Sequence, residues 1–224
     1  MKRSLDIAIL GSGNMGSALG RRFADAGHRV TYSFSRDPAK LERLARESGP
    51  RARTATPREA ARDADLVLLA VHWTQMPKVL RAAGSLRGKI VLDLTNPMTA
   101  ADDRLAVGHR KSGGELVARR ARGASVVKAF NTVPAELLRA GPDVLAEQPS
   151  VCYCGDDKKS KLAVARLIRQ IGYEPVDCGP LETARYLEPL AMVIVELAYN
   201  QGHRPEVGLR VLRPGRKRGR ARRA

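Results

Sequence analysis

The stretch ILGSGNMGSALG, residues 9–20, decides the fold. It continues an apolar run, Leu5–Leu10, that is typical of a buried strand, and it carries three glycines, Gly11, Gly13 and Gly16. In a GxGxxG turn between a strand and a helix, the first glycine allows the tight turn and the second lets a pyrophosphate approach the backbone. The third lets the helix pack close to the strand. We therefore predict a dinucleotide site at this turn.

Outward from this turn, apolar runs alternate with helical patterns. Strands are predicted at Arg29–Phe34, Ala52–Thr54, Asp65–Val71, Lys89–Leu94, Ser125–Phe130, 150–154 and 174–178. Helices are predicted to begin near Met15, Pro38, Pro57, Gln75 and Asp156 or Asp157, and a long last helix is predicted from about Leu181 to Tyr199. Residues 98–113 lack a clear period and are expected to form a loop or a broken helix.

The repeated strand and helix units predict an α/β fold class: a doubly wound parallel sheet, the Rossmann NAD(P)-binding fold, with a C-terminal βαβα extension. We expect residues 1–135 to form the Rossmann core and residues 136–205 to form the α/β extension of the same domain. Residues 206–224 form a basic tail with no apolar face, which we expect to be disordered.

Composition limits the function classes. The 224 residues carry a formal net charge of +17, which would attract a nucleic-acid backbone. However, nine Arg or Lys and one acid follow from residue 204 onward, so about half of the excess lies in the tail, where we expect at most nonspecific nucleic-acid contact. The three cysteines lack the CxxC spacing of a redox pair or a zinc knuckle, so we expect cytosolic thiols. No run is long enough for a signal peptide or a membrane helix, so we expect a cytoplasmic protein.

The tip of the second strand distinguishes the two nicotinamide cofactors. A site for NAD places Asp or Glu there to bind the ribose hydroxyls. Here the tip carries Ser35 and Arg36, and Asp37 follows one residue later. A hydroxyl and a guanidinium can both bind a 2′-phosphate. The sequence therefore predicts NADP as the cofactor.

The strand ends that face the cofactor carry mostly neutral hydrogen-bonding groups. Among them, His72 and Lys128 are the only candidates for a general base, and neither has an adjacent carboxylate in the sequence. A histidine alone at a strand end is more often a packing or hydrogen-bonding residue. Hydride transfer between two stacked rings needs no base. We therefore assign no catalytic side chain and favour this kind of reaction.

The pieces GSGNMG, SRD after the second strand, VHW, VVKAFNTVPA (126–135) and VCYCGDDKKSK (151–161) together resemble one family. It is the family of NADPH-dependent reductases of coenzyme F-420 (F420), a deazaflavin, with the related reductase domains of membrane metalloreductases. The resemblance covers about residues 5–203 and implies a hydride transfer between NADPH and a flavin-like ring stacked on the nicotinamide. The alternatives are an NADPH-dependent flavin or ferric reductase, or a non-catalytic NADP-sensing module whose tail binds nucleic acid.

The resemblance also implies which residues form the site. Residues near the pyrophosphate and 2′-phosphate would be Gly11, Ser12, Gly13, Asn14, Met15, Gly16, Ser35 and Arg36; residues bordering the nicotinamide and its ribose would be Val71, His72, Asn96 and Ala129; residues facing a diffusible acceptor would be Asn131, Thr132 and Pro134.

Two further expectations concern metals and partners. The adjacent Asp156 and Asp157 are interpreted as a helix cap rather than a metal site, and no metal site is predicted. The last helix is apolar around more of its circumference than one packed face requires, which predicts a homodimer contact. Docking within the same chain is the alternative.

Overall fold

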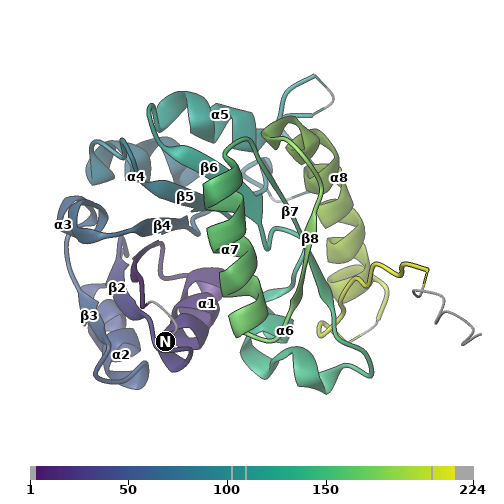
Figure 1. Ribbon diagram of the computed structural model, residues 1–224, viewed down its shortest axis with the longest axis horizontal. Helices are drawn as coiled ribbons and strands as arrows, with labels where there is room; N and C mark the ends of the chain where they lie inside the picture. Colours follow the sequence, from purple (N-terminus) through teal and green to yellow (C-terminus); the bar gives the residue numbers. More distant parts are fainter. Residues whose placement is uncertain (1–3, 102, 109, 203, 215–224) are drawn as a thin grey trace, which may run out of the picture.

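The computed structural model describes residues 4–101, 103–108, 110–202 and 204–214, and its central element is a sheet with helices on both faces (Figure 1). The strands of these residues are β1 Asp6–Leu10, β2 Arg29–Ser33, β3 Ala52–Thr54, β4 Leu66–Leu69, β5 Ile90–Asp93, β6 Ser125–Ala129, β7 Ser150–Gly155 and β8 Glu174–Asp177. They form one sheet in the order β3-β2-β1-β4-β5-β6-β7-β8.

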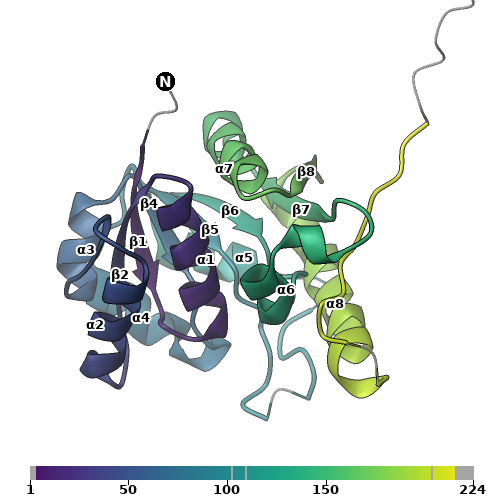
Figure 2. The ribbon, with the colours of Figure 1, turned by 90° about the horizontal axis from the view of Figure 1, so that it is seen from below.

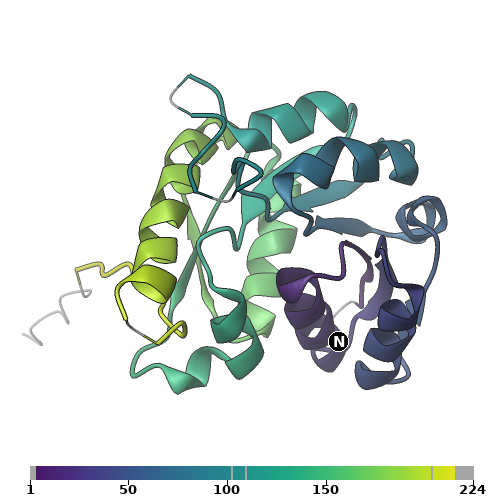
Figure 3. The same cartoon turned by 180° about the vertical axis from the view of Figure 1, so that it is seen from behind.

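Two apolar cores separate the helices into two layers. One core joins the sheet to α1 Asn14–Asp25, α2 Pro38–Glu47, α6 Ala135–Ala140 and α7 Lys158–Gln170. The other joins it to α3 Pro57–Asp63, α4 Met76–Ala83, α5 Gly113–Arg120 and α8 Ala184–Val195. Figures 1 and 3 show this arrangement from opposite sides. The two-layer cover confirms the predicted α/β fold class and explains why strand β4 reads as a continuous apolar run.

The order of the strands reverses between β1 and β4. The chain adds β2 and β3 on one side of β1, and then adds β4, β5 and β6 on the other side, all parallel. In such sheets a ligand binds in the crevice beyond the carboxyl ends of the strands at this reversal. The fold therefore places the candidate site at the ends of β1, β2, β4, β5 and β6.

The last two strands differ from the predicted parallel sheet. Strand β7 pairs antiparallel with β6, and β8 pairs parallel with β7. The segment between β6 and β7 contains one short helix, α6, of six residues. The sheet is mostly parallel, as predicted, and the β6–β7 pair is its antiparallel exception among the described strands.

Two helices were not anticipated, and one was expected to be longer. Helix α5 begins at Gly113 after a capping box formed by Ser112 and Glu115, and α6 follows β6 directly. Before α5, the described residues from 98 to 111 form a projecting loop (Figures 2 and 3). The predicted helix from 181 to 199 is divided into a 3₁₀ turn (η3, Leu181–Thr183), α8, and a π-helical turn (η4, Glu196–Asn200).

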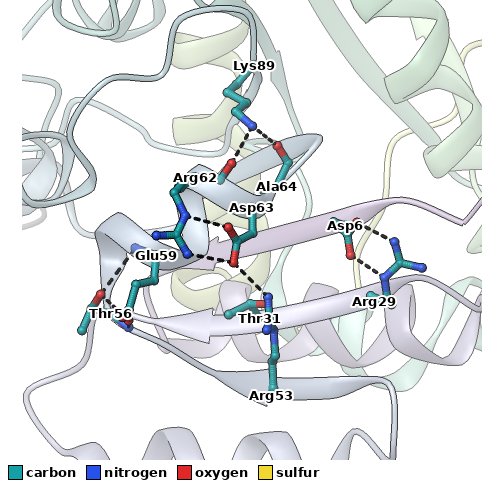
Figure 4. Close-up of polar contacts among 10 residues, drawn as sticks. All are labelled: Asp6, Arg29, Thr31, Arg53, Thr56, Glu59, Arg62, Asp63, Ala64 and Lys89. Carbon is teal, nitrogen blue, oxygen red and sulfur yellow. Dashed lines mark hydrogen bonds and ion pairs between the residues drawn. The ribbon is translucent and has the colours of Figure 1, made fainter.

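The amino edge of the sheet is held by ion pairs and backbone contacts (Figure 4). Asp6 at the start of β1 forms a two-pronged ion pair with Arg29 at the start of β2. Lys89, just before β5, donates to the carbonyls of Arg62 and Ala64, at 2.8 and 2.6 Å. These groups are paired within the fold, so this edge has a structural role.

The segment after α8 partly returns to the sheet. The backbone N–H of Ser150 at the start of β7 donates to the carbonyl of Leu209 at 2.6 Å, and the N–H of Val211 donates to the Ser150 hydroxyl at 3.1 Å. The predicted disordered tail, 206–224, thus includes a contact with β7. Residues 215–224, which carry most of its charge, lie outside the described residues.

Candidate functional site

The glycine turn joins β1 to α1 as the GxGxxG pattern requires. Gly11 has φ +117°, and a Cβ there would lie 2.3 Å from the carbonyl oxygen of Ala70 at the end of β4. A Cβ on Gly16 would lie 1.9 Å from the carbonyl oxygen of Gly11. At these two positions the backbone leaves no room for a side chain, so both glycines are required by packing alone.

Gly13 is different, because an added Cβ would meet no atom within 4 Å. Its exposed backbone forms the N-cap of α1, which has no side-chain cap and no acidic residue in its first turn. The N–H groups of the first turn, from Asn14 onward, therefore have no capping side chain and stand at the positive end of the helix dipole. This open, uncapped turn fits a pyrophosphate.

The tip of β2 lies beside the glycine turn, since the N–H of Gly11 donates to the carbonyl of Ser33 at 3.0 Å. Phe34 then has φ +62°, a conformation that L-residues rarely adopt, and turns the chain toward Ser35 and Arg36. The Ser35 hydroxyl accepts the N–H of Asp37 at 3.1 Å. Arg36 is exposed and forms no ion pair with any residue the structure describes. Strain at this tip fits a ligand-binding turn.

The tip of β4 continues into a 3₁₀ turn, η1 (Trp73–Gln75), for which His72 is the N-cap. The His72 Nδ1 atom lies 2.8 Å from the Thr74 hydroxyl and accepts the N–H of Thr74 at 3.3 Å. Val71 is half-buried beside this turn. His72 therefore caps this turn at the tip of β4.

A reciprocal pair of asparagines links the tips of β5 and β6. The Asn96 amide donates to the carbonyl of Asn131 at 3.0 Å, and the Asn131 amide donates to Asn96 Oδ1 at 3.1 Å. The Asn131 amide also donates to the carbonyl of Leu187 on α8 at 2.9 Å. Ala129 and Pro134 are buried on either side of Asn131. The structure thus brings together residues that the sequence placed on separate loops.

Two polar atoms at the tip of β6 have no partner. Asn131 is 7% exposed and Thr132 is 2% exposed, yet Asn131 Oδ1 and Thr132 Oγ1 form no hydrogen bond with any described residue. A buried polar atom without a partner costs about 1–3 kcal/mol. The amide oxygen of Asn131 can accept a hydrogen bond and the hydroxyl of Thr132 can donate one, and an amide or imide edge presents the complementary N–H and C=O. The nicotinamide carboxamide and a flavin-like ring both carry such an edge.

Beneath this pair lies a buried cluster of charges that sequence reasoning missed. Lys128 is fully buried, and its Nζ atom lies 2.8 Å from Asp93 Oδ2, 3.2 Å from Glu188 Oε1 and 2.5 Å from the carbonyl oxygen of Thr95. Burial alone would lower the pKa of Lys128, but the charges of Asp93 and Glu188 outweigh it and raise the pKa. All three N–H groups are used, so Lys128 stays protonated and cannot act as a base.

The sequence did contain a signal for this cluster. Asp93, Lys128 and Glu188 each interrupt an apolar run, and charges in such surroundings are almost always paired when buried. Strand β5 lies beside β6, with Asp93 opposite Lys128. Burial raises the pKa of Glu188, which accepts two backbone N–H groups of α5. The sequence does not show where α8 lies, so Glu188 could not be identified as the third member of the cluster.

The other candidate groups have structural partners. Asp157 accepts the N–H of Ser160 at 2.7 Å and caps α7, and no cluster of metal-ligating side chains occurs among the described residues. Burial raises the pKa of the Cys154 thiol to about 12. Cys178, half-buried beside β7, differs because the neighbouring Cys152 thiol lowers its pKa to about 7.

Comparison with known proteins identifies the family of this site. The profile described as "NADP oxidoreductase coenzyme F420-dependent" matches residues 6–97, which include the glycine turn and the tips of β2, β4 and β5. An F420-dependent NADP reductase from Methanothermobacter thermautotrophicus is 31% identical over 86% of this chain and 89% of its own length. The chain belongs to the F420-dependent NADP oxidoreductase family. The profile and this relative are named as an oxidoreductase and a reductase, respectively.

Two further comparisons concern a longer relative and a solved structure. The metalloreductase STEAP3 from Rattus norvegicus is 31% identical over 85% of this chain, but the chain spans only 37% of that protein. A crystal structure of a putative F420-dependent NADP reductase from Arthrobacter superposes with a TM-score of 0.79, at 31% identity, over 87% of this chain and 93% of that chain. Among the residues described, no helix combines the length and the apolar character needed to cross a membrane.

Proposed function

We propose that this protein transfers hydride between NADPH and a deazaflavin, coenzyme F420, by direct transfer between stacked rings. The observation that carries the proposal is the tip of β6, on the same carboxyl edge of the sheet as the glycine turn, where Asn131 Oδ1 and Thr132 Oγ1 are buried without a hydrogen-bond partner among the described residues. Such an edge can orient planar rings, which is the main contribution an enzyme makes to hydride transfer. The family name and the relative from Methanothermobacter support F420 as the acceptor.

The residues expected to hold NADP follow the sequence prediction. The open turn at Gly13 and the N-terminus of α1 would face the pyrophosphate, while Ser35 and Arg36, which has no ion pair among the described residues, would bind the 2′-phosphate. When bound, NADPH supplies the hydride from its nicotinamide ring. Around that ring, Val71, His72, Asn96 and Ala129 would exclude water and fix its orientation; Asn131, Thr132 and Pro134 would face the acceptor.

A second candidate function is reduction of a free flavin, or of ferric ion through a flavin. The 31% identity to a metalloreductase favours it. Flavin and F420 both present an imide edge that the Asn131 and Thr132 atoms could bind, so the site chemistry alone does not separate them. Membership of an oxidoreductase family favours both reactions over the non-catalytic NADP-sensing module. We also propose that the acceptor is diffusible and that the reaction takes place in the cytoplasm.

The test compares acceptors directly. We expect NADPH to reduce F420, followed as loss of deazaflavin absorbance, with a kcat/KM at least about tenfold above that for FMN or FAD. The variant Thr132→Val removes a hydroxyl without a partner in the fold, so its thermal stability should not fall. Its kcat/KM for the acceptor should fall about five- to tenfold, the value of one hydrogen bond.

Three outcomes distinguish the proposals. Reduction of FMN or FAD but not of F420 would favour the second candidate function. No reduction of any of the three acceptors would contradict both. If Thr132→Val weakens NADPH binding instead of acceptor reduction, the hydroxyl binds the carboxamide of the cofactor.

We further propose a homodimer formed through the exposed side of α8 and η4. Tyr186, Val193 and Leu197 recur at helical spacing and are 73%, 53% and 38% exposed. Light scattering at micromolar concentration should give twice the 24.4 kDa chain mass, and Val193→Asp should reduce it to one chain because a buried unpaired charge is costly. A monomeric wild type would contradict the dimer.

A further inference from the structure

The buried charge cluster of Lys128, Asp93 and Glu188 includes none of the residues proposed to face a ligand, yet its members adjoin the residues that precede or hold the asparagine pair. We propose that Lys128, with Asp93 and Glu188, is a positioning device that fixes Asn96 and Asn131 for hydride transfer. This inference rests on the proposed function, because the asparagines are taken to border the nicotinamide and the acceptor. The described side chains connect the cluster to each asparagine by a separate route.

The first route runs through the tip of β5. Lys128 donates to the carbonyl of Thr95 at 2.5 Å, and Asp93 Oδ1 accepts both the N–H and the hydroxyl of Thr95, at 2.9 and 2.7 Å. Thr95 is therefore held at its N–H, its carbonyl and its side chain, and Asn96 follows it directly. Through Thr95, the Lys128 ammonium thus fixes the position of the Asn96 backbone.

The second route runs through α8. Glu188 lies 3.2 Å from the Lys128 ammonium and accepts the N–H groups of Gly113 and Gly114, at 2.8 and 3.0 Å. The residue before it, Leu187, offers its carbonyl to the Asn131 amide at 2.9 Å. The cluster therefore fixes the position of α8, and α8 holds Asn131.

The glycines at the start of α5 show how closely the cluster is packed. A Cβ on Gly113 would lie 3.1 Å from Glu188 Oε1, and a Cβ on Gly114 would lie 3.1 Å from Lys128 Cε. The N-terminus of α5 thus comes close enough to donate two N–H groups to the carboxylate. Without these two N–H donors, the buried carboxylate of Glu188 would have Lys128 as its single partner among the described residues.

A stabilising role alone does not account for these residues. Buried ion pairs seldom stabilise a fold more than apolar side chains of similar volume, and their attested advantage is a specified geometry. Hydride transfer depends on such geometry, because a displacement of about 1 Å in the reacting groups can cost on the order of 100-fold in rate. The cluster meets this need at the point where β5, β6 and α8 converge.

The test uses Glu188→Gln in the full chain, with Glu182→Gln as the matched control. Glu182 is 64% exposed and pairs only with Arg185 among the described contacts. We expect Glu188→Gln to lower kcat for hydride transfer by at least about tenfold while the Kd for NADPH stays within about threefold of wild type. Amide hydrogen exchange should become faster at residues 95–96 and 130–133. Glu182→Gln should leave kcat, the Kd for NADPH and the exchange rates unchanged.

The outcomes separate this proposal from the proposed function. If the wild type reduces no acceptor, the proposed function fails, and hydrogen exchange alone decides whether the cluster positions the strand tips. Unchanged kcat and unchanged exchange in a folded Glu188→Gln variant would overturn the positioning role. So would a loss confined to NADPH affinity.

A second variant covers the case in which Glu188→Gln does not fold. The triple change Lys128→Met, Asp93→Asn and Glu188→Gln removes all three charges but leaves Thr95 without its donor. A folded triple variant with low kcat and faster exchange supports positioning, whereas wild-type kcat overturns it. If neither variant folds, the cluster is a requirement of folding, and the proposal is overturned as well.

Discussion

Replacing Arg36 by alanine should weaken NADPH binding by about 10- to 100-fold and leave NADH binding unchanged. A hydrogen bond between charged groups contributes about 1.5–3 kcal/mol, and only the 2′-phosphate of NADPH offers Arg36 such a partner. Because Arg36 is exposed and forms no ion pair within the described fold, its loss should not lower thermal stability. Fluorescence titration with both cofactors measures the expected loss of selectivity.

Arg43→Ala is the matched control for this experiment. Arg43 is also exposed, and it lies further along α2, the helix that follows Arg36. A general effect of positive charge on a nucleotide would appear in both variants, whereas a 2′-phosphate contact appears in Arg36→Ala alone. Equal losses in the two variants, or a wild type that prefers NADH by about tenfold, would contradict the assignment of NADP.

Alanine at two glycines of the same turn should give opposite results. A Cβ on Gly16 would overlap the carbonyl oxygen of Gly11, so Gly16→Ala should destabilise the fold by about 3 kcal/mol or more. Gly13→Ala places its methyl group in open space at φ −70°, which alanine adopts readily, so its melting temperature should stay near that of wild type. Gly13→Ala should nevertheless lose NADPH affinity by more than about tenfold, since the methyl group occupies the approach of the pyrophosphate.

Thermal unfolding and NADPH titration of both variants provide the measurement. Each variant serves as the control for the other, because they carry the same substitution in one turn. Normal NADPH binding by Gly13→Ala would show that the pyrophosphate does not use this turn.

The sequence predicted the features that depend on local pattern. Apolar runs located β1 and β4, and the glycine spacing located the turn between β1 and α1, because sterics within a few residues determine both. Helix α5 escaped notice because it opens with Gly113 and Gly114, which are poor helix formers. A tertiary contact explains the two glycines, since both donate a backbone N–H to Glu188, 74 or more residues away.

Other features could not be predicted because a strand pattern carries no direction. The run from 150 to 154 reads the same whether it pairs parallel or antiparallel with β6, and the structure shows the antiparallel pairing. The charge cluster shows the same limit. Lys128 and Asp93 are recognisable in the sequence as charges within apolar runs. Their third partner, Glu188, comes from α8, which is 60 residues further along the chain and whose position no local pattern gives.

The strand order also has a consequence for aggregation. The two outermost strands, β3 and β8, are the places where a sheet could recruit a strand from another molecule. Strand β8 contains Pro175, which lacks an N–H, and β3 has only three residues, one of them Arg53. Both edge strands thus disfavour the pairing of sheets edge to edge into fibrils. A second molecule would therefore associate through helical surfaces.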